Sequence, residues 1–516
     1  MAISSIFNDV IGPVMRGPSS SHSAAACRIG LLLNDLMSGE ITRVEIDYDP
    51  NGSLVTTHES QGTDMGLYGG LMGWQADDPR MMHYQGHVAQ SGIDIQVNYV
   101  SYGATHPNNY RIRISNSKIS HKINAISTGG GMMEIQEIDG SNLSICGDFH
   151  ELLIFSPNPS QLMKSIPDND QSEPFLHKTF VQIRQSIPFS TAEVQYFEAL
   201  TDVHQVCYLK PVLPTLSRKD LKVPFITCKE MLEIGERENL ELWELALEYE
   251  SARGNATKEE VFQQMRNIAQ IMQAGIAEGL KGKAYEDRIL PAQSPGFKDK
   301  MEANQLLDGG MLNTIVLFTT AMMEVKSSMG VFVAAPTAGS CGALPGAILG
   351  AAEHQNASEE AVAKALLAAG IMGVFISEHA TFAAEVAGCQ AETGAGGSMA
   401  AAGLVSLMNG SLHQAVAAAS LALQNALGIV CDPIGNRVEA PCLGKNVMAA
   451  SNALSCANMA LANYEYLIPY DEVVQSMKEV GDMMAHELSC TGLGGLATTP
   501  TGQAILKKLQ GKAQYC

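Results

Sequence analysis

Short runs along the first 150 residues alternate between hydrophobic and polar positions. A period of two is typical of a strand with one buried face. The alternating runs are residues 44–48, 93–100, 110–115 and 132–138. Two further segments, 24–33 and 63–72, have helix-forming composition. The pattern therefore predicts an α+β domain over residues 1–150.

From residue 223 onward the pattern changes to longer segments of helical composition, most of them with a Gly, Pro or Asn at a boundary. These segments are residues 229–252, 258–279, 313–326, 358–377, 398–410, 414–428, 446–464 and 470–488. We predict a large all-α domain over residues 223–516, whose loops carry several of the cysteines.

Composition limits the classes of partner. The formal net charge is −21, which argues against nucleic-acid binding because such proteins present basic surfaces.

No cationic segment followed by an apolar stretch opens the chain, so we expect a cytoplasmic protein. Residues 327–352 and 393–412 lack Asp, Glu, Lys and Arg, but Pro and Gly interrupt the first, and the second is rich in Ala and Gly rather than Leu. We interpret both as buried core and expect no membrane partner.

The chain has eleven cysteines, and in a protein expected in the cytoplasm these are more consistent with thiols than with disulfides. Cys389, Cys431 and Cys442 lie in turn-rich segments, and the Pro and Gly between the last two keep the backbone out of a helix, so that thiolates can converge on one point. We infer a metal site. Zinc is a competing interpretation, but the sequence lacks the paired Cys-x2-4-Cys spacing of structural zinc sites. Five other cysteines have apolar or helical neighbours and are interpreted as small buried hydrophobic residues: Cys27, Cys146, Cys207, Cys228 and Cys456.

A loop of small polar residues, Gly17-Pro-Ser-Ser-Ser-His22, precedes a predicted helix. Ser19, Ser20 or Ser21 would cap that helix. A helix N-terminus with hydroxyls and free N–H groups is also a natural seat for a carboxylate, so the loop is either a simple N-cap or an anion site. The turn Ser127-Thr-Gly-Gly-Gly131 leaves a similar choice, because its backbone could approach an anionic group closely or form only a bulge.

Several segments together match the motifs of one family. Besides the three cysteines, which are 42 and 11 residues apart, the matching segments are Ala335-Pro-Thr-Ala-Gly-Ser-Cys-Gly342, Gly388-Cys-Gln-Ala-Glu392, Cys431-Asp-Pro433, Pro441-Cys442 and Gly494-Gly-Leu-Ala-Thr-Thr-Pro-Thr-Gly502. With these segments the chain resembles the iron–sulfur L-serine dehydratases over residues 1–150 and 223–510, in the order that single-chain members use.

The resemblance implies an α,β-elimination that converts L-serine to pyruvate and ammonia. It implies a 4Fe-4S cluster held by Cys389, Cys431 and Cys442, with one iron open to substrate. It also implies that the C-terminal Cys516 folds back onto that iron until substrate displaces it. The protein would act on a small amino acid as a homo-oligomer, which we expect to be a dimer.

The resemblance also assigns roles around the substrate. In the family, the Gly-Pro-Ser-Ser-Ser-His loop lines the substrate pocket, and His22 is the best acid/base candidate. The expected catalytic residues are His22, Ser20 and Ser21, and the expected substrate-binding residues are Ser19, Ser127, Thr128, Gly129 and Gln61.

Two positions depart from the family pattern. Gln61 stands where the family has the histidine of Gly-His-x-Thr-Asp, and Gln cannot carry a proton near neutral pH. Either His58 or Glu59 replaces it from a shifted loop, or the histidine's role was polar recognition, or the substrate differs from serine. Cys490 stands where the family usually has an acidic residue.

Residues 151–222 carry the weakest pattern. Two strand-like runs, 151–156 and 206–211, flank a loop-like segment over 165–173. Some members of the family carry a small ligand-sensing domain of the ACT type here. We predict either a linker or a degenerate ACT-like region.

Two alternative functions use the same scaffold. One is the same elimination on another small β-substituted acid, such as threonine, cysteine or a hydroxyaspartate. The other is a non-catalytic iron or oxygen sensor, which an open-iron cluster would permit. A pyridoxal-phosphate enzyme fits less well, because it needs a Schiff-base lysine near a phosphate-binding Gly loop, and Lys298 in Gly296-Phe-Lys298 is a poor candidate.

Overall fold

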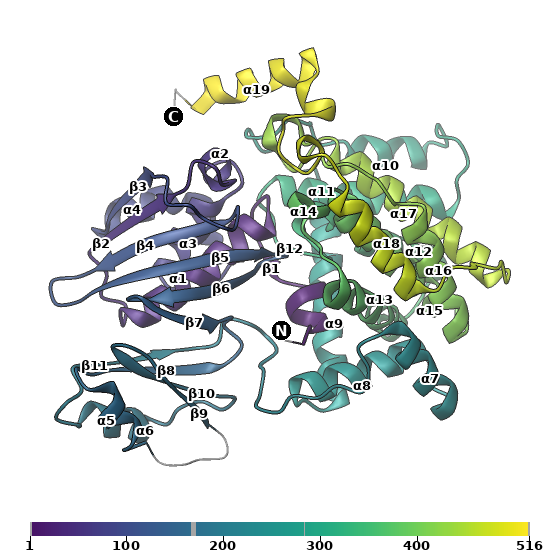
Figure 1. Cartoon of the computed structure of the whole chain (residues 1–516). Helices are drawn as coiled ribbons and strands as arrows, with labels where there is room; N and C mark the ends of the chain where they lie inside the picture. Colours follow the sequence, from purple (N-terminus) through teal and green to yellow (C-terminus); the bar gives the residue numbers. More distant parts are fainter. Residues whose placement is uncertain (1–2, 167–171, 283, 514–516) are drawn as a thin grey trace. The chain divides into compact units, whose positions relative to one another are not determined.

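The structure is a computed structural model that describes residues 3–166, 172–282 and 284–513 (Figure 1). Its contacts divide the chain into two compact units, one of Ser21–Leu221 and one of Met1–Ser20 with Lys222–Cys516. We call them the sheet unit and the helical unit. Mixed sheets in the N-terminal half and mostly helices in the C-terminal half agree with the predicted order of an α+β part followed by an α part.

The main sheet of the sheet unit has six strands in the order β3-β2-β4-β5-β6-β7. All neighbours pair antiparallel except β2 and β3, which run parallel. The strands are β2 (Arg43–Tyr48), β3 (Asp94–Tyr99), β4 (Asn109–Ser115), β5 (Ser120–Gly129), β6 (Met132–Ile138) and β7 (Ser141–Ile145). Their period-two pattern buries one face, as in β2, where Val44, Ile46 and Tyr48 are inaccessible to solvent.

Helices α1 (Ala25–Leu36) and α3 (Thr63–Leu71) pack closely against each other in the sheet unit. The close approach depends on glycine, because a Cβ at Gly70 would overlap the carbonyl oxygen of Cys27 and one at Gly66 would overlap that of Ser23. The remaining helices of this region are α2 (Leu54–Thr57) and α4 (Tyr84–Ser91), with the 3-10 helix η3 (Pro79–His83).

Residues 150–209 form a second, four-stranded antiparallel sheet in the order β11-β8-β10-β9. Its elements are β8 (His150–Phe155), α5 (Pro159–Met163), β9 (Ser172–Leu176), β10 (Phe180–Gln185), α6 (Thr191–Glu198) and β11 (Gln205–Leu209). The succession β-α-β-β-α-β is that of ferredoxin-like domains. Phe155, Phe180 and Leu209 belong to the same core as the six-stranded sheet, so this segment is a folded layer of the sheet unit and not an irregular connection.

The helical unit is built from long helices that pack on several sides. Its helices are α7 (Cys228–Glu238), α8 (Leu242–Gly254), α9 (Lys258–Gly279), α10 (Ser294–Glu302), α11 (Met311–Ser327), α12 (Ala343–Gln355), α13 (Glu359–His379), α14 (Ala384–Ala387), α15 (Ala395–Leu407), α16 (Leu412–Gln424), α17 (Cys442–Leu461), α18 (Tyr470–Asp482) and α19 (Pro500–Ala513). Sequence reasoning missed α12, whose Pro345 lies in the first turn, where a missing N–H costs no helical hydrogen bond.

The stretches without charged residues lie in the core of the helical unit, as predicted. In α15, twelve residues from Ala395 to Leu407 are buried. Within the described residues, one helix, α13, is long and apolar enough to cross a membrane by length and composition alone, and 78% of its apolar window is buried inside the protein. A mostly buried helix of a protein core passes the same test of length and composition.

The predicted boundaries differ from the compact units at the N-terminus. Strand β1 (Val14–Met15) pairs antiparallel with β12 (Phe332–Val333). The π-helix η1 (Ile6–Val10) packs on α13, and its first N–H donates to Glu250 of α8 at 2.8 Å. The first twenty residues therefore belong to the helical unit, which also contains this two-stranded sheet and is not purely helical.

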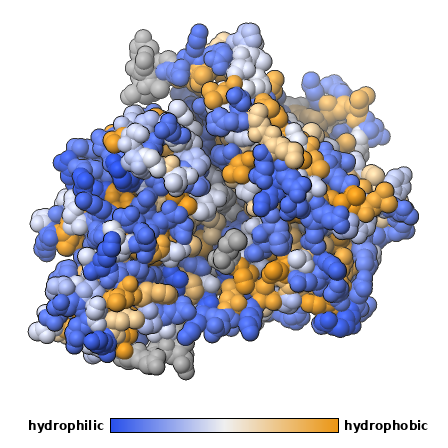
Figure 2. All heavy atoms as spheres, viewed as in Figure 1, coloured by the Kyte–Doolittle hydropathy of each residue, from blue (hydrophilic) through white to orange (hydrophobic). Residues whose placement is uncertain are grey.

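Hydrophilic residues cover much of the face shown in Figure 2, with hydrophobic residues between them.

Candidate active site

The thiols of Cys389 and Cys431 lie together in the helical unit. Their sulfur atoms and a carboxylate oxygen of Glu392 are all within 4.8 Å of one another. Cys389 follows α14 after Gly388, whose φ of 70° lets the chain turn there, and Cys431 forms an isolated parallel bridge with Ser489. Both cysteines are almost fully buried, at 1% and 3% exposure.

Cys442 is the first residue of α17 and is also buried. Burial raises its pKa to about 12, and the charge of Cys389 acts on it in the same direction. The hydrogen bond to Cys431 and burial raise the pKa of Cys389 well above its ordinary value. Burial therefore favours the protonated form of these thiols, and a bound metal would have to displace their protons to form thiolates.

Two lysines supply positive charge beside the thiols. Lys445 donates to the carbonyl oxygen of Val430 and to Oδ1 of Asp432, both at 2.6 Å. Lys326 is buried and donates to the carbonyl oxygen of Val438. Both charges act to lower the pKa of Cys442 against the effect of burial. Three buried thiols with cations beside them form a donor set that suits an anionic, thiolate-bound metal cluster.

Cys490 packs against Cys389 and Cys431, although sequence reasoning treated it only as a departure from the family pattern. The N–H of Cys490 donates to the carbonyl oxygen of Cys431 at 2.9 Å. No spacing signal pointed to this, because the Ser489–Cys431 bridge brings together segments almost sixty residues apart. Cys341 is buried, and its sulfur contacts that of Met323 at 3.8 Å. The predicted ligand Cys516 lies outside the described residues.

Glu392 is a second functional candidate that sequence reasoning missed. Its Oε1 accepts a hydrogen bond from the hydroxyl of Thr337 at 2.6 Å, and burial raises its pKa to about 7. The Gly-Cys-Gln-Ala-Glu motif could have indicated it, since Glu392 lies three residues after Cys389 and reaches the same point from the π-helix η5 (Gln390–Gly394).

Asn446 connects the loop of residues 335–342 to the start of α17. Its amide donates to the carbonyl oxygens of Gly339 and Cys442, both at 2.8 Å, and its Oδ1 accepts from the N–H groups of Gly342 and Ala343. Because all four partners are backbone groups, this one buried side chain fixes the loop relative to Cys442.

Of the predicted serine residues, Ser20 lies beside this loop in the helical unit. Its hydroxyl oxygen accepts a hydrogen bond from the N–H of Ala338 at 3.3 Å, next to Thr337. Ser20 is 2% exposed and Ser19 is 9% exposed. A hydroxyl, backbone N–H groups and the carboxyl group of Glu392 therefore occur on neighbouring segments of one unit.

In the sheet unit, Ser21 and Ser127 lie together, because the Ser127 hydroxyl donates to the carbonyl oxygen of Ser21 at 2.7 Å. His22 is buried, its Nε2 is 3.0 Å from the hydroxyl of Thr57, and burial lowers its pKa to about 4. The imidazole is therefore neutral at neutral pH.

The glycine turn after Ser127 does form a bulge. The register between β5 and β6 shifts from Ser127 to Gly129, and Gly129, Gly130 and Gly131 all have positive φ. Thr128 is exposed there. The carbonyl oxygen of Gly131 accepts a hydrogen bond from Arg28 at 2.6 Å, which directs a cationic side chain to the turn.

Gln61 is buried at 3% exposure, and its backbone carbonyl accepts from the hydroxyl of Ser23 at 3.1 Å. The nearby imidazole is that of His58, whose Nδ1 is 2.8 Å from Oδ2 of Asp64 and whose Nε2 is 2.8 Å from the hydroxyl of Tyr99. Burial alone would lower the pKa of His58, but the hydrogen bond and charge of Asp64 outweigh burial and raise it. The imidazole beside Asp64 is therefore that of His58, and position 61 carries the buried Gln.

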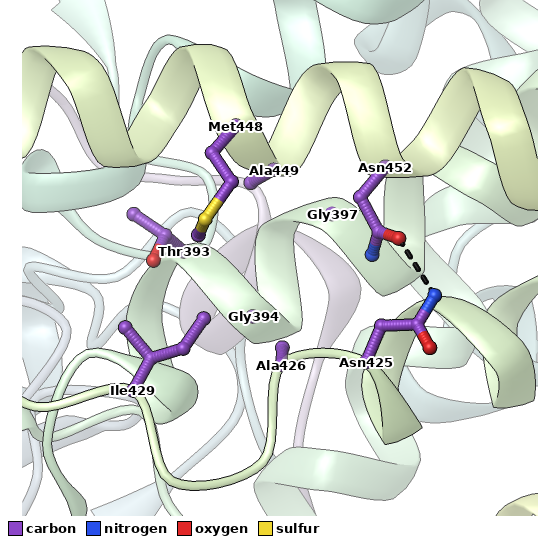
Figure 3. A pocket seen from close by; sticks show the side chains of 9 residues that line it. All are labelled: Thr393, Gly394, Gly397, Asn425, Ala426, Ile429, Met448, Ala449 and Asn452. Carbon is purple, nitrogen blue, oxygen red and sulfur yellow. Dashed lines mark hydrogen bonds between the residues drawn. The ribbon is translucent and has the colours of Figure 1, made fainter.

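A small pocket of about 110 Å³ lies in the helical unit, next to the segment that carries Cys389 (Figure 3). Thr393, Ile429 and Met448 line one side, and Asn425 donates to Asn452 at 2.8 Å on the other. Thr393 also donates to the sulfur of Cys389 at 3.4 Å. The lining contains no ionisable group and none of the candidate thiols, so the pocket is not the metal site.

Sequence comparisons match much of the helical unit to a family model and to named relatives, and one reported relative aligns over 94% of the chain. The family model described as "Serine dehydratase alpha chain" matches residues 237–497. The "Probable L-serine dehydratase, alpha chain" of Bacillus subtilis is 36% identical over 289 residues, which cover 56% of this chain and 96% of the relative. The "L-serine dehydratase, alpha chain" of Peptoniphilus asaccharolyticus is 36% identical over 280 residues, or 54% of this chain and 96% of the relative. The "L-serine dehydratase" of Helicobacter pylori J99 is 25% identical over 502 residues, covering 94% and 96% of the two chains.

Proposed function

The chain belongs to the serine dehydratase alpha chain family, and from that premise we propose that it deaminates L-serine to pyruvate and ammonia with a 4Fe-4S cluster. The observation that carries the proposal is the convergence of buried thiols, with the sulfurs of Cys389 and Cys431 and an oxygen of Glu392 within 4.8 Å of one another. The cluster ligands in this proposal are Cys389, Cys431 and Cys442, with Cys516 as the predicted fourth.

When bound, the cluster supplies a Lewis acid that polarises the β-hydroxyl of the substrate. Elimination then removes one proton from Cα and hydroxide from Cβ, so that serine loses the elements of water and becomes aminoacrylate. Aminoacrylate tautomerises to an imine, and one water hydrolyses the imine to pyruvate and ammonia. The net reaction neither consumes nor releases an oxidant.

The chain's own residues bind and orient the substrate in this proposal. Ser20, which meets the N–H of Ala338, and the neighbouring backbone N–H groups favour a carboxylate. Glu392, whose Oε1 accepts a hydrogen bond from Thr337, places a carboxyl group beside the thiols. In this position the carboxyl group can form a hydrogen bond with the hydroxyl that leaves the substrate. Neutral His22 is the proton acceptor we assign to the Cα proton, at one of its imidazole nitrogens.

The decisive experiment is anaerobic purification followed by iron and sulfide analysis and by an assay of pyruvate formation from L-serine. The proposal expects both a cluster and turnover, with turnover lost in Cys389→Ala. Cys146→Ser is the matched control, because Cys146 is a thiol of the sheet unit far from these residues in sequence. A protein that binds no iron under these conditions, or a Cys389→Ala variant with full turnover, would refute it.

Gln61 supports a second candidate, which is the same elimination on another small β-substituted acid. The family's histidine position carries a buried Gln, while His58 is the imidazole beside Asp64. A panel of L-threonine, L-cysteine and a hydroxyaspartate, assayed beside L-serine, ranks these substrates by kcat/KM. A cluster without turnover on any of them would favour the sensor alternative.

The expected cytoplasmic homodimer remains part of the proposal. The acidic net charge of −21 is compatible with a free amino acid as the partner and argues against nucleic acid. Light scattering on the anaerobically purified chain measures its mass in solution and tests the dimer.

A further inference from the structure

A histidine and two carboxylates lie together in the sheet unit. A ring nitrogen of His58 and carboxylate oxygens of Glu59 and Asp64 are all within 4.8 Å of one another. All three residues come from one short segment, which runs from the end of α2 into the first turn of α3. Histidine nitrogen and carboxylate oxygen are donors that divalent transition-metal ions such as Zn²⁺, Mn²⁺ and Fe²⁺ take in proteins.

The local backbone brings these residues together. The N–H of Gln61 donates to the carbonyl oxygen of Thr57 at 2.8 Å. The N–H of Asp64 donates to the carbonyl oxygen of His58 at 3.2 Å. Between these two bonds, Gly62 has a φ of 86°, a left-handed conformation that a residue without a Cβ adopts readily. The chain therefore reverses at Gly62 and returns Asp64 to His58.

One oxygen of the Asp64 carboxylate lacks a partner. Asp64 is 7% exposed, and its Oδ2 lies 2.8 Å from Nδ1 of His58. Its Oδ1 is buried and has no hydrogen-bond partner among residues 3–166, 172–282 and 284–513. Buried polar atoms are almost always hydrogen-bonded, so this oxygen indicates either a bound water or a bound ion.

The charges of the segment favour a cation over water. The ion pair that Asp64 forms within the described chain is with His58, and no Lys or Arg of the described residues pairs with either Asp64 or Glu59. Two carboxylates with a neutral imidazole carry two negative charges. A divalent ion would balance them and would also give Oδ1 of Asp64 a partner.

The surroundings of His58 suit a metal ligand. Neighbouring ligand atoms of one ion, each about 2.1 Å from it, lie about 3 Å apart, which is close to the 2.8 Å between Nδ1 of His58 and Oδ2 of Asp64. On the other side of the ring, Nε2 is 2.8 Å from the hydroxyl of Tyr99. A metal-bound histidine usually donates its second N–H to such an oxygen, which orients the ring. With an ion on Nδ1, the ring proton is on Nε2 and is donated to Tyr99.

We propose that His58, Glu59 and Asp64 bind one divalent transition-metal ion, through Nδ1 of the histidine and through oxygens of both carboxylates. Glu59 is exposed, so the ion enters from solvent, and water completes its coordination. The ion links the end of α2 to the start of α3 and holds the turn that carries Gln61. The site uses none of the cysteines and is independent of the iron–sulfur function proposed above.

The test uses Mn²⁺ as the probe and the full-length protein after a chelator has removed loosely bound metal. Thiols bind Mn²⁺ poorly, and the electron paramagnetic resonance signal of free Mn²⁺ measures how much is bound. We expect one bound Mn²⁺ per chain, with a coupling to one histidine nitrogen in the electron spin echo spectrum. Mn²⁺ should also raise the melting temperature, because the ion binds the folded turn.

Substitutions in the segment define the ligands. Asp64→Asn and His58→Ala should abolish Mn²⁺ binding. Glu59→Gln changes an exposed residue and leaves the fold intact, and it should weaken binding by more than about tenfold, because even loss of a second-shell partner costs about 10- to 100-fold. Tyr99→Phe, which removes such a partner, should weaken binding about tenfold. The matched control is Glu40→Gln at another exposed position of the sheet unit, which should bind Mn²⁺ as the wild type does.

Cys389→Ala distinguishes this site from the thiols of the helical unit and should retain Mn²⁺ binding. Loss of binding in Cys389→Ala, or wild-type binding in Glu59→Gln, would place the ion elsewhere and overturn the inference. A wild type that binds no Mn²⁺ would show that water alone meets Oδ1 of Asp64, and would also overturn it. These measurements do not depend on cluster assembly or on serine turnover, so this inference and the proposed function fail separately.

Discussion

Asp432 accepts a hydrogen bond from the N–H of Leu496 at 2.9 Å through its Oδ2. Its other oxygen accepts from Lys445 at 2.6 Å. Asp432, the residue after Cys431, therefore links the Gly494-Gly-Leu-Ala497 segment to the start of α17. A Cβ at Gly495 would come within 2.6 Å of the Asp432 carboxylate, which explains the need for glycine at this contact.

Asp432→Ala should destabilise the helical unit and weaken iron retention. Removing one partner of a largely buried ion pair leaves Lys445 uncompensated, which costs on the order of 3 kcal/mol. The measurement is the urea denaturation midpoint of the metal-free protein together with iron content after anaerobic loading. The control is Asp482→Ala, at an exposed position of α18. Equal midpoints for both variants would contradict the role of Asp432.

Asn446→Ala should lower stability by about 2 kcal/mol or more, because it leaves buried backbone groups of the 335–342 loop and of Cys442 without their partner. The same variant should bind iron less tightly, since Cys442 loses a restraint. Asn458→Ala changes an exposed Asn of the same helix and should change stability little. Thermal melts of both variants, with iron analysis, distinguish the two positions, and similar melts would argue against this role for Asn446.

Gly70→Ala should destabilise the sheet unit, since the new Cβ overlaps the carbonyl oxygen of Cys27 where α3 crosses α1. Overpacking of this kind costs about 1–3 kcal/mol. Gly86 lies in α4 with open space around it, so Gly86→Ala should instead stabilise by up to about 1 kcal/mol through helix propensity. Opposite signs in the two denaturation curves are the expected result, and a neutral Gly70→Ala would refute the close packing.

His22 should make the protein sensitive to acid. Burial lowers its pKa from 6.5 to about 4 in the folded state, so the unfolded chain takes up a proton first as the pH falls. The stabilising contribution of neutral His22 is present above about pH 6.5 and is lost as the pH falls toward about 4, by up to about 3 kcal/mol.

The measurement is the free energy of unfolding as a function of pH for wild type and His22→Gln. The variant should lose less stability than the wild type across that interval, because Gln does not titrate. His83→Gln, at an exposed position, should retain the wild-type profile. Parallel profiles for wild type and His22→Gln would show that the histidine titrates normally.

The sequence by itself determined the order of the elements and the family. Period-two patterns placed β2, β3, β4 and β6, and uncharged runs gave helices that are buried on all sides, because burial selects for apolar residues locally. The family resemblance, drawn from the cysteine segments and their neighbours, is confirmed by the matching family model. Such motifs are local in sequence, so one chain suffices to find them.

Tertiary structure decided which distant groups meet. The pairing of β1 with β12 assigned the first twenty residues to the helical unit, and two-residue strands leave no periodic pattern. Asn446 became visible only through its contacts with the 335–342 loop. Cys490 joined Cys431 because of one isolated bridge with Ser489. Hydrogen bonds between segments far apart in the chain depend on the packing of the whole unit, and local residue patterns do not encode them.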